Sequence, residues 1–392
     1  MASVQAHPTP AVLVWARETA GLTHEAIAKK LKVGVERIRS WESGSDQPSL
    51  AQLRKLATAT RRPLAVFYLP EAPRTFEAMH DFRAGTDSYF VTLRSPSLTT
   101  EIRKARDRRE WALELLEQLE ERPPLFGITA SLDQAPESTA QRLRAALGVS
   151  TDTQGRWRAD YEAFREWRKL LERAGVLTFQ ATDIDLAEAR GFSISLKPLP
   201  VAVVNIKDAY RGRIFTLLHE LAHIALNDGG ICDLDDNERQ NESARIEAYC
   251  NHVAGAVLYP KDELLAADVM RHHPKNQLAW SEDEIVALSR KFGGSREALL
   301  VRLLTLGLTN ERFYRSKRED YRRQYAKWRE ERKGGFALPH VVALASAGLM
   351  FTGLVIEGFN RERITASDVS DYLDIRIKHL PEIERDLVAQ TG

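Results

Sequence analysis

Residues 215–226 are the segment that most restricts how this chain can fold. The sequence FTLLHELAHIAL contains no Gly or Pro and is apolar around most of a helical circumference, so it predicts a buried helix. His219, Glu220 and His223 are the ionisable side chains within it, and burying them without partners would be costly. His219 and His223 lie on one face of such a helix, with Cβ atoms about 5–6 Å apart. The fold must therefore bury this helix and give these side chains a shared polar site.

The two histidines and the glutamate between them indicate a metal site. Two imidazoles at positions i and i+4 can bind one zinc ion, and His-Glu-x-x-His is the pattern of zinc metalloproteases. With 10 histidines in 392 residues, composition alone predicts roughly 0.02 such matches. Two hydrogen-bonded core histidines beside a buried glutamate are the weaker alternative, since an unpaired buried carboxylate is costly. We predict that His219 and His223 bind Zn²⁺, with Mn²⁺ as the alternative metal, and that Glu220 is the general base.

A tetrahedral catalytic site needs a third protein ligand, which the segment that follows can supply. Residues 246–258 have the pattern of a second buried helix, on which Glu247 shares a face with Asn251 and Ala254. We predict Glu247 as the third ligand, because it is a carboxylate embedded in an apolar helix. The other candidates are His252, which points away from that face, Cys250, and three acids of a polar loop, Asp233, Asp235 and Asp236.

Residues 11–69 have the pattern of a small helical bundle. Thr23 is a predicted N-cap, and Lys32-Val33-Gly34 interrupts the apolar periodicity before a helix at 35–42. A helix, a short turn containing Gly and a second helix form the arrangement of helix-turn-helix modules. The residues that resemble the XRE/Cro-type helix-turn-helix family are Trp41, Glu42, Gly44, Pro48, Leu53, Leu56 and Ala57. The resemblance makes DNA a candidate partner through residues 11–69.

By this resemblance, residues 35–42 are the recognition helix. The side chains expected to meet base edges are Val35, Glu36, Arg37 and Ser40, while Arg39, Lys32 and Arg54 could bind phosphates. Glu36 is a departure from this role, because a carboxylate near DNA is useful only if it accepts a hydrogen bond from cytosine. A helical module that binds protein rather than DNA is the alternative.

Charge is distributed unevenly along the chain, although its total is close to zero. The 56 Lys and Arg residues against 55 Asp and Glu residues leave a formal net charge of +1. Residues 1–76 carry 11 basic and 6 acidic residues, whereas residues 228–247 carry 7 acidic and 2 basic residues. Residues 312–333 are predominantly basic and predict a solvated helix with one packed aromatic stripe, with DNA contact as the alternative. The distribution is compatible with DNA at one end of the chain and a different partner at its centre.

The sequence predicts neither a membrane anchor nor export. Its longest uncharged apolar run, 341–356, has 16 residues, fewer than the ~20 that a spanning helix needs, and predicts one buried helix. Cys232 and Cys250 are the only cysteines, and the N-terminus lacks a charged segment followed by an apolar one, so neither a disulfide scaffold nor a secretory signal is expected. We expect a cytoplasmic protein without membrane contact, and its oligomeric state is left open.

Residues 175–260 resemble the ImmA/IrrE family of metallopeptidases. The resemblance rests on three β-prone runs at 176–179, 192–196 and 201–206, the HELAH motif at 219–223, and the pattern E-x-x-C-N-x-x-A-x-x-x-L-x-P at 247–260. It implies a gluzincin-like zinc site with Glu247 as a ligand. It also implies a protein substrate, which in this family is often a transcriptional repressor.

The predicted fold class is α+β and mostly helical. The predicted segments are a helix-turn-helix bundle at 1–69, a connector at 70–98, a zincin-like metallopeptidase domain with a small β-sheet at 99–265, and a helical C-terminal region at 266–392. We predict a zinc-dependent endopeptidase that cleaves a repressor, with the helix-turn-helix targeting DNA or that repressor and the strand at 201–206 pairing with the substrate. The alternative is a DNA-binding regulator or antitoxin-like protein whose metal domain is sensory or structural.

Overall fold

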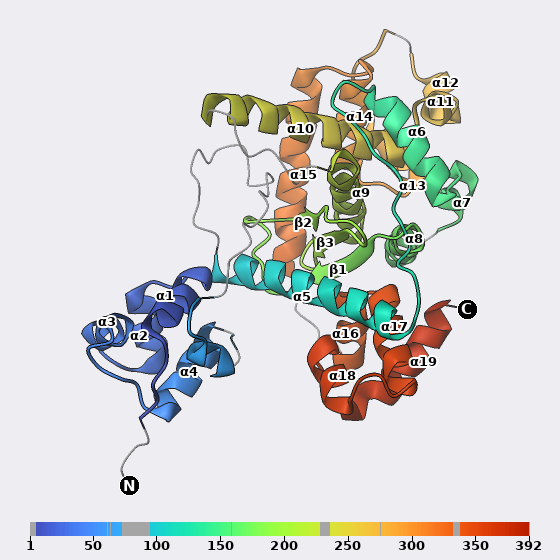
Figure 1. Cartoon of the computed structure of the whole chain (residues 1–392). Coiled ribbons are helices and arrows are strands. Elements are labelled where there is room, and N and C mark those ends of the chain that lie inside the picture. The colour runs from blue at the N-terminus through green and yellow to red at the C-terminus, as the bar shows by residue number, and fades with distance from the viewer. Residues whose placement is uncertain are drawn as a thin grey trace. The chain divides into compact units, whose positions relative to one another are not determined.

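Two structural units make up the described part of the chain. The computed structural model describes residues 5–60, 62, 64–72, 95–157, 159–227, 236–274, 276–331 and 338–391. One unit ends at Lys104 and the other begins at Ala105, inside helix α5 (Pro96–Gln118). The units are described separately below, and Figure 1 labels their elements. The four segment boundaries expected from the sequence stay predictions, and residues 73–94 of the expected connector lie outside the described residues.

The N-terminal unit contains the helical bundle expected from the sequence. Its elements are α1 (Pro10–Thr19), α2 (His24–Leu31), α3 (Val35–Ser43), α4 (Leu50–Thr60) and a 3₁₀ helix, η1 (Leu64–Tyr68). Thr23 caps α2 by accepting a hydrogen bond from the Ala26 amide at 3.1 Å. Gly44 ends α3 in the left-handed conformation, with φ of 76°. The buried side chains of this bundle include Val12, Leu13, Ile27, Leu31, Ile38, Trp41, Leu53 and Leu56.

Trp41 and Glu42 connect α3 to the two helices before it. Trp41 is buried in the bundle core. The Glu42 carboxylate accepts hydrogen bonds from Nε of Arg17 on α1, at 2.7 Å, and from its NH2 group, at 3.1 Å. Nε2 of His24 on α2 lies 3.0 Å from the same carboxylate. This adjacent apolar and acidic pair therefore fixes α3 against both α1 and α2.

The second unit contains a three-stranded sheet in the order β1-β3-β2. β1 (Leu177–Ala181) is parallel to β3 (Val201–Asn205), with Phe179 opposite Val203. β2 (Gly191–Ile194) is antiparallel to β3, with Phe192 opposite Val203. The three strands confirm the predicted small sheet. The expectation that 201–206 pairs with substrate is wrong, because neighbouring strands already occupy both edges of β3.

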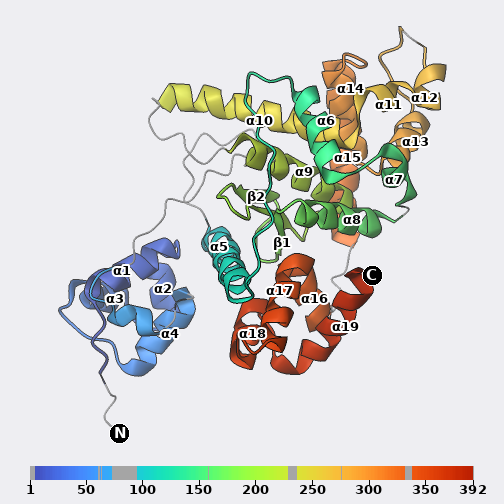
Figure 2. The ribbon, with the colours of Figure 1, turned by 45° about the vertical axis from the view of Figure 1, so that its right-hand side comes forward.

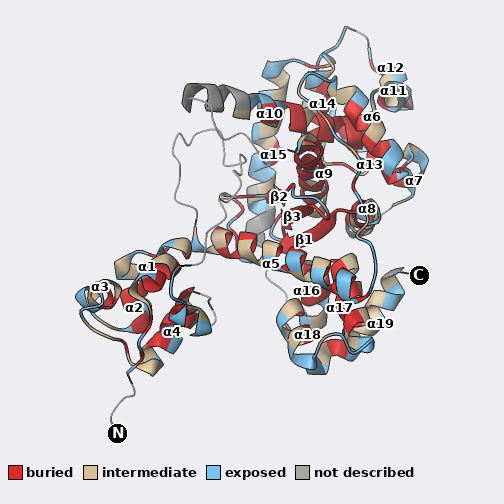
Figure 3. Cartoon of the chain, viewed as in Figure 1, coloured by how far each residue is buried: buried red, intermediate tan, exposed pale blue. Residues whose placement is uncertain are grey.

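Helices enclose the sheet and bury helix α9 (Tyr210–Leu226), which carries the His-Glu-x-x-His motif. α9 packs on β2, β3, α8 (Asp160–Arg173) and α10 (Asp236–Leu258), and α10 packs on α6 (Pro136–Leu147). Figures 1 and 2 both show α9 between the sheet and α10, and Figure 3 shows that it is buried along most of its length. The described side chains of the shared core include Leu217, Leu218, Leu221, Ala222, Val253, Ala254 and Val257. The apolar circumference of α9 thus has a partner on each side.

The rest of the second unit is helical, and it confirms the mostly helical α+β prediction. Its further elements are α7 (Thr151–Arg156), α11 (Lys261–Leu265), α12 (Asp268–His272), α13 (Glu282–Phe292), α14 (Arg296–Thr305), α15 (Glu311–Glu331), α16 (Pro339–Ala347), α17 (Leu349–Asn360), α18 (Ala366–Leu373), η2 (Ile377–His379) and α19 (Leu380–Thr391).

The apolar run at 341–356 does not form the single helix that the sequence predicts. It is divided at Gly348 between α16 and α17, which are bent by 109°. Among the described residues no single helix is long and apolar enough to cross a membrane, although this bent pair passes the same test of length and composition when taken together. At the break, Gly348 adopts φ of 80° and ψ of 164°, a conformation that ends one helix and begins the next.

The corner between α16 and α17 covers the outer edge of β1. The Ala345 carbonyl accepts hydrogen bonds from Nε2 of Gln180, at 2.8 Å, and from NH1 of Arg168, at 2.9 Å. Oγ of Ser346 donates to the Gln180 carbonyl at 3.1 Å, and NH2 of Arg168 donates to the Thr178 carbonyl at 2.7 Å. The carbonyl groups of Thr178 and Gln180 on this edge are therefore occupied. In the described part of the chain, no strand pairs with the outer edge of β2.

Candidate metal centre

Helix α9 holds His219, Glu220 and His223 in the interior of the second unit. Its end is defined by Asn227, which adopts the left-handed conformation with φ of 52°. The exposed fractions are 0% for His219, 3% for Glu220 and 8% for His223. These three buried ionisable groups need hydrogen-bonding, charged or metal partners, because burying a polar group without such a partner is unfavourable.

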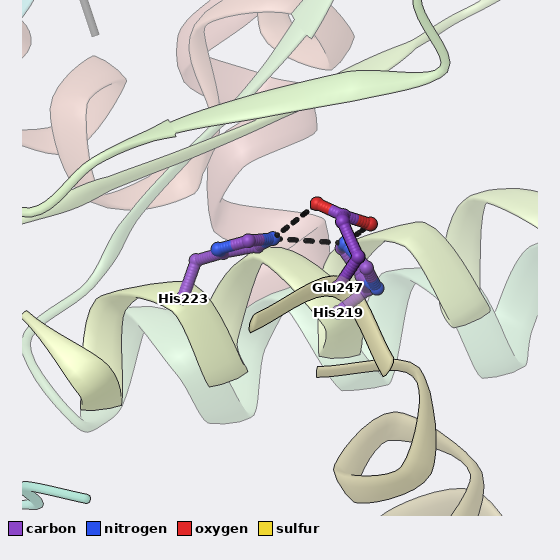
Figure 4. A group of neighbouring side chains, drawn as sticks. All are labelled: His219, His223 and Glu247. Carbon is purple, nitrogen blue, oxygen red and sulfur yellow. Dashed lines mark hydrogen bonds and ion pairs between the residues drawn. The ribbon is translucent and has the colours of Figure 1, made fainter. Parts of the chain in front are cut away.

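Glu247 from α10 completes a group of potential metal ligands with the two histidines. Nε2 of His219 and Nε2 of His223 lie 3.0 Å apart. The Glu247 carboxylate lies 3.4 Å from Nε2 of His219, through Oε2, and 3.2 Å from Nε2 of His223, through Oε1. Figure 4 shows these side chains converging from the two helices. Among the described residues, this is the group of His, Cys, Asp or Glu side chains whose ligand atoms lie close enough to one another to hold one ion.

The spacing of these atoms fits a tetrahedral zinc site. With metal–nitrogen and metal–oxygen bonds near 2.0–2.1 Å, a tetrahedron has edges of about 3.3–3.4 Å between ligand atoms. The three separations in this group, 3.0, 3.2 and 3.4 Å, lie close to that value. Two imidazoles and one carboxylate are also a ligand set that zinc uses in catalytic sites, where a fourth position stays open. The residues present therefore fit the metal that the sequence predicts.

The electrostatics of the group favour an ionised Glu247. Burial opposes ionisation, but hydrogen bonds with His219 and His223 and the charge of their imidazoles outweigh it, and they hold the pKa of the Glu247 carboxyl far below its ordinary value. A ligand carboxylate has to be deprotonated before it can bind a cation. Glu247 meets that condition over the whole physiological pH range.

Cys250 lies beside the group but is not part of it. The thiol is buried, and burial raises its pKa although a hydrogen bond with His223 acts in the opposite direction. A neutral thiol is a poor metal ligand, since the thiolate is the binding form. Asp233 and Asp235 lie outside the described residues, as does the side chain of Asp236.

His252, the other alternative to Glu247, is directed to a different partner. Its Nε2 lies 3.0 Å from Oε1 of Glu137 on α6. Glu137 also accepts hydrogen bonds from NH1 and NH2 of Arg302, at 2.5 and 2.9 Å. Burial opposes ionisation of Glu137, but Arg302 and His252 together lower the pKa of its carboxyl. This cluster joins α6, α10 and α14 away from the candidate ligands, and Thr139 on α6 adds a 2.8 Å hydrogen bond to the Tyr249 hydroxyl on α10.

Glu220 faces the start of strand β2 and lies outside the ligand group. A β-carbon placed on Gly191 would lie 3.4 Å from Oε1 of Glu220. The predicted general base therefore lies next to the main chain of a strand whose outer edge is unpaired in the described structure. The sequence analysis assigns no role to Gly191. A Gly directly before a β-prone run is the signal that could have revealed it, since a strand Gly often marks a close approach of another group.

The predicted DNA-contacting residues lie on α3, where acids accompany the arginines. NH1 of Arg39 lies 3.0 Å from Oε1 of Glu36, and Nε of Arg37 lies 3.6 Å from Oδ2 of Asp46. Ser40 donates from Oγ to the Glu36 carbonyl at 2.8 Å. Val35 is half-buried and packs against the bundle core, whereas Glu36, Arg37 and Arg39 are exposed. The exposed surface of α3 thus offers arginines whose charge is partly balanced by neighbouring carboxylates.

Comparison with known proteins agrees with both parts of this description. Residues 172–304 match the family described as the IrrE N-terminal-like domain, a metallopeptidase family, and residues 13–67 match the helix-turn-helix family. The first match contains all three strands and every residue of the candidate metal centre. No curated protein and no solved structure matches the chain. The chain therefore joins an XRE-type helix-turn-helix, a DNA-binding domain, to a metallopeptidase-like domain of the IrrE/ImmA type.

Proposed function

We propose that the protein is a zinc-dependent endopeptidase that cleaves a partner protein. The observation that carries the proposal is the convergence of His219, His223 and Glu247, with ligand atoms 3.0–3.4 Å apart, beside Glu220 on the same buried helix. A purely structural zinc site has four protein ligands and no need for a general base. Three ligands and an adjacent carboxylate are the set that a hydrolytic site requires.

In this proposal each side chain has a separate task. His219, His223 and Glu247 hold the ion, and Mn²⁺ is the alternative to Zn²⁺. When bound, zinc supplies Lewis acidity that polarises the scissile carbonyl and lowers the pKa of water. Glu220 accepts the proton of the attacking water and then delivers it to the departing amine. Its buried position excludes bulk water, which strengthens its interaction with the reacting groups.

The substrate is proposed to bind as an extended peptide along the outer edge of β2. Main-chain hydrogen bonds to an exposed sheet edge provide affinity that depends little on sequence. The edge of β1 is occupied by the α16–α17 corner, whose Ala345 and Ser346 bond to Gln180. Since Gly191 of β2 lies next to Glu220, a peptide on this edge would pass close to the general base.

The helix-turn-helix is proposed to bring the peptidase to its substrate, either by binding DNA or by binding a transcriptional repressor on it. In helix-turn-helix complexes the helix before the recognition helix crosses the DNA backbone. At the end of α2, Lys29, Lys30 and Lys32 are exposed, and lysines at such a position can bind phosphates. A repressor is the proposed substrate class, because cleaving it would couple peptide hydrolysis to transcription.

The test compares the wild-type protein with Glu220→Gln and with Glu263→Gln, a control that removes an exposed carboxylate of α11. Each protein is incubated with candidate repressors and Zn²⁺ or Mn²⁺, and the products are analysed by mass spectrometry. We expect cleavage by wild type and Glu263→Gln, and none by Glu220→Gln. Equal cleavage by Glu220→Gln would refute the role of Glu220. Stoichiometric metal binding without any cleavage by wild type would instead favour a DNA-binding regulator with a sensory or structural metal domain.

A further inference from the structure

Gly191 occupies the position where the edge strand meets the helix of the metal centre. It is the first residue of β2 and is paired with Val204 of β3. Its φ is not in the left-handed region, so any residue could adopt this backbone conformation. The reason for a Gly at this position is therefore the space around it rather than backbone freedom.

The surroundings of Gly191 leave no room for a side chain. A β-carbon there would lie 2.5 Å from the Val203 carbonyl oxygen and 2.5 Å from Cγ2 of Thr216, in addition to 3.4 Å from Oε1 of Glu220. Val203 belongs to the central strand, and Thr216 lies one helical turn before Glu220 on α9. Both are buried, so neither can move away without disturbing the core. A side chain would thus displace β2 outward, by on the order of 1 Å to restore ordinary contact.

We propose that Gly191 is a positioning residue that sets the distance between the peptide-binding edge of β2 and the carboxylate of Glu220. This inference rests on the proposed function, because it assumes that a substrate pairs with β2 and that Glu220 is the general base. Because Gly191 has no side chain, the main chain of β2 packs directly against the helical turn from Thr216 to Glu220. A peptide bound to that strand is then held at a fixed separation from Glu220 and the metal ligands. A misplacement of about 1 Å can lower the rate about 100-fold.

The test is Gly191→Ala, compared with Gly358→Ala as a matched control. A β-carbon on Gly358, in α17, would lie 2.7 Å from Cδ2 of Leu115 on α5, so it also creates a steric conflict inside the second unit. That conflict involves neither β2 nor α9. Both variants should lose stability, and both should keep wild-type zinc content. Only Gly191→Ala should lower kcat, by about 100-fold, while KM changes a few-fold, because the misplacement affects the reacting geometry more than binding.

A second measurement does not depend on activity. Hydrogen exchange of the 191–194 amides in the metal-free protein should accelerate in Gly191→Ala and stay near wild type in Gly358→Ala. If Gly191→Ala does not fold, the double variant with Thr216→Ser, which deletes Cγ2 and keeps the hydroxyl, is measured in its place. Wild-type kcat or unchanged exchange in the folded Gly191 variant would overturn the inference and leave the proposed function intact. If the wild-type protein cleaves no partner, the proposed function fails and the inference fails with it.

Discussion

Gly348 provides a direct test of how the C-terminal helices are held on the sheet. Its φ of 80° and ψ of 164° fall in a region that is essentially restricted to Gly, and an Ala there costs about 1–3 kcal/mol in backbone strain. A β-carbon would also lie 2.5 Å from the Thr178 carbonyl oxygen and 2.6 Å from Oε1 of Glu172. Overpacking of a filled site costs about 1–3 kcal/mol more. We therefore expect Gly348→Ala to lower the free energy of unfolding by roughly 4 kcal/mol.

The surrounding groups cannot relieve this conflict by moving. Glu172 is buried, where it accepts hydrogen bonds from the Thr178 hydroxyl and from the Met350 amide, the latter at 2.9 Å. The Thr178 carbonyl belongs to β1 and also accepts a hydrogen bond from Arg168. Displacing either acceptor would leave a buried polar group without its partner, which is itself unfavourable.

Gly353 in the same helix is the matched control. It lies within α17, and a β-carbon on it would meet no atom within 4 Å. Ala in place of an unstrained helical Gly stabilises by about 0.5–1 kcal/mol, so Gly353→Ala should shift stability in the opposite direction. The assay is urea unfolding followed by a signal from the second unit, together with hydrogen exchange along β1, which should accelerate only in Gly348→Ala. A loss below about 1 kcal/mol in Gly348→Ala, or the same sign for both variants, would refute the reasoning.

Three further perturbations test other contacts. Arg302, which is 1% exposed, donates hydrogen bonds to Glu137 and to the Tyr259 carbonyl. Arg302→Met should therefore lower the free energy of unfolding by about 3 kcal/mol in thermal or urea unfolding, and adding Glu137→Gln should restore part of that loss. Stability losses that simply add in the double variant would contradict the pairing. Zinc at 100 times its dissociation constant should stabilise the metal-free protein against unfolding by about 2.7 kcal/mol, and Glu247→Gln should lose this gain. Calorimetry measures both, and an equal gain in the two proteins would remove Glu247 from the ligand set. Burial, together with the charge of Asp208 and its acceptance of the phenol hydrogen bond, raises the pKa of Tyr325 to about 12. The stabilisation that this hydrogen bond provides is therefore present below pH ~10 and is lost as pH rises toward 12. Ultraviolet titration of wild type and Tyr325→Phe checks this, and a Tyr325 that titrates at its ordinary pKa would count against it.

The candidate ligands on α9 follow from neighbours in the sequence alone. The spacing of His219 and His223 puts two imidazoles on one helical face wherever that helix is packed. Glu247 required a further step, because its helix begins after a stretch of 228–235 that separates it from α9 in the chain. The apolar pattern of 246–258 predicted a buried helix in which Glu247 is the embedded carboxylate. The packing of α10 on α9 then placed its carboxylate 3.2–3.4 Å from the imidazoles.

The strand order could not be predicted in the same way. The run at 201–206 is the most apolar of the three β-prone runs, which is typical of a strand buried on both faces and paired on both sides. The prediction that this run binds the peptide was wrong, because a strand paired on both sides has no free edge. β3 follows β2 in the chain and still lies in the centre of the sheet, because it pairs with β1 as well. That arrangement depends on contacts between distant segments.

The break at Gly348 depends on the same kind of contact. Its apolar neighbours are compatible with a continuous helix, and a Gly inside a helix is tolerated at a cost of about 1 kcal/mol. The corner is stabilised by hydrogen bonds from Arg168 and Gln180, which are more than 160 residues away in the chain. No local pattern in the apolar run contains that information.

The sequence by itself indicated the N-terminal helical bundle, the three strands, the His-Glu-x-x-His motif and the family of both domains, because helical period, capping and residue type act over a few neighbouring positions. Only the tertiary structure decided which sheet edge is occupied, which strand lies next to Glu220, and why Gly191 and Gly348 cannot carry a side chain. These features are distances between segments far apart in the chain. They follow from close packing of the whole interior, where adding or removing one methyl group changes the contacts of the neighbouring side chains.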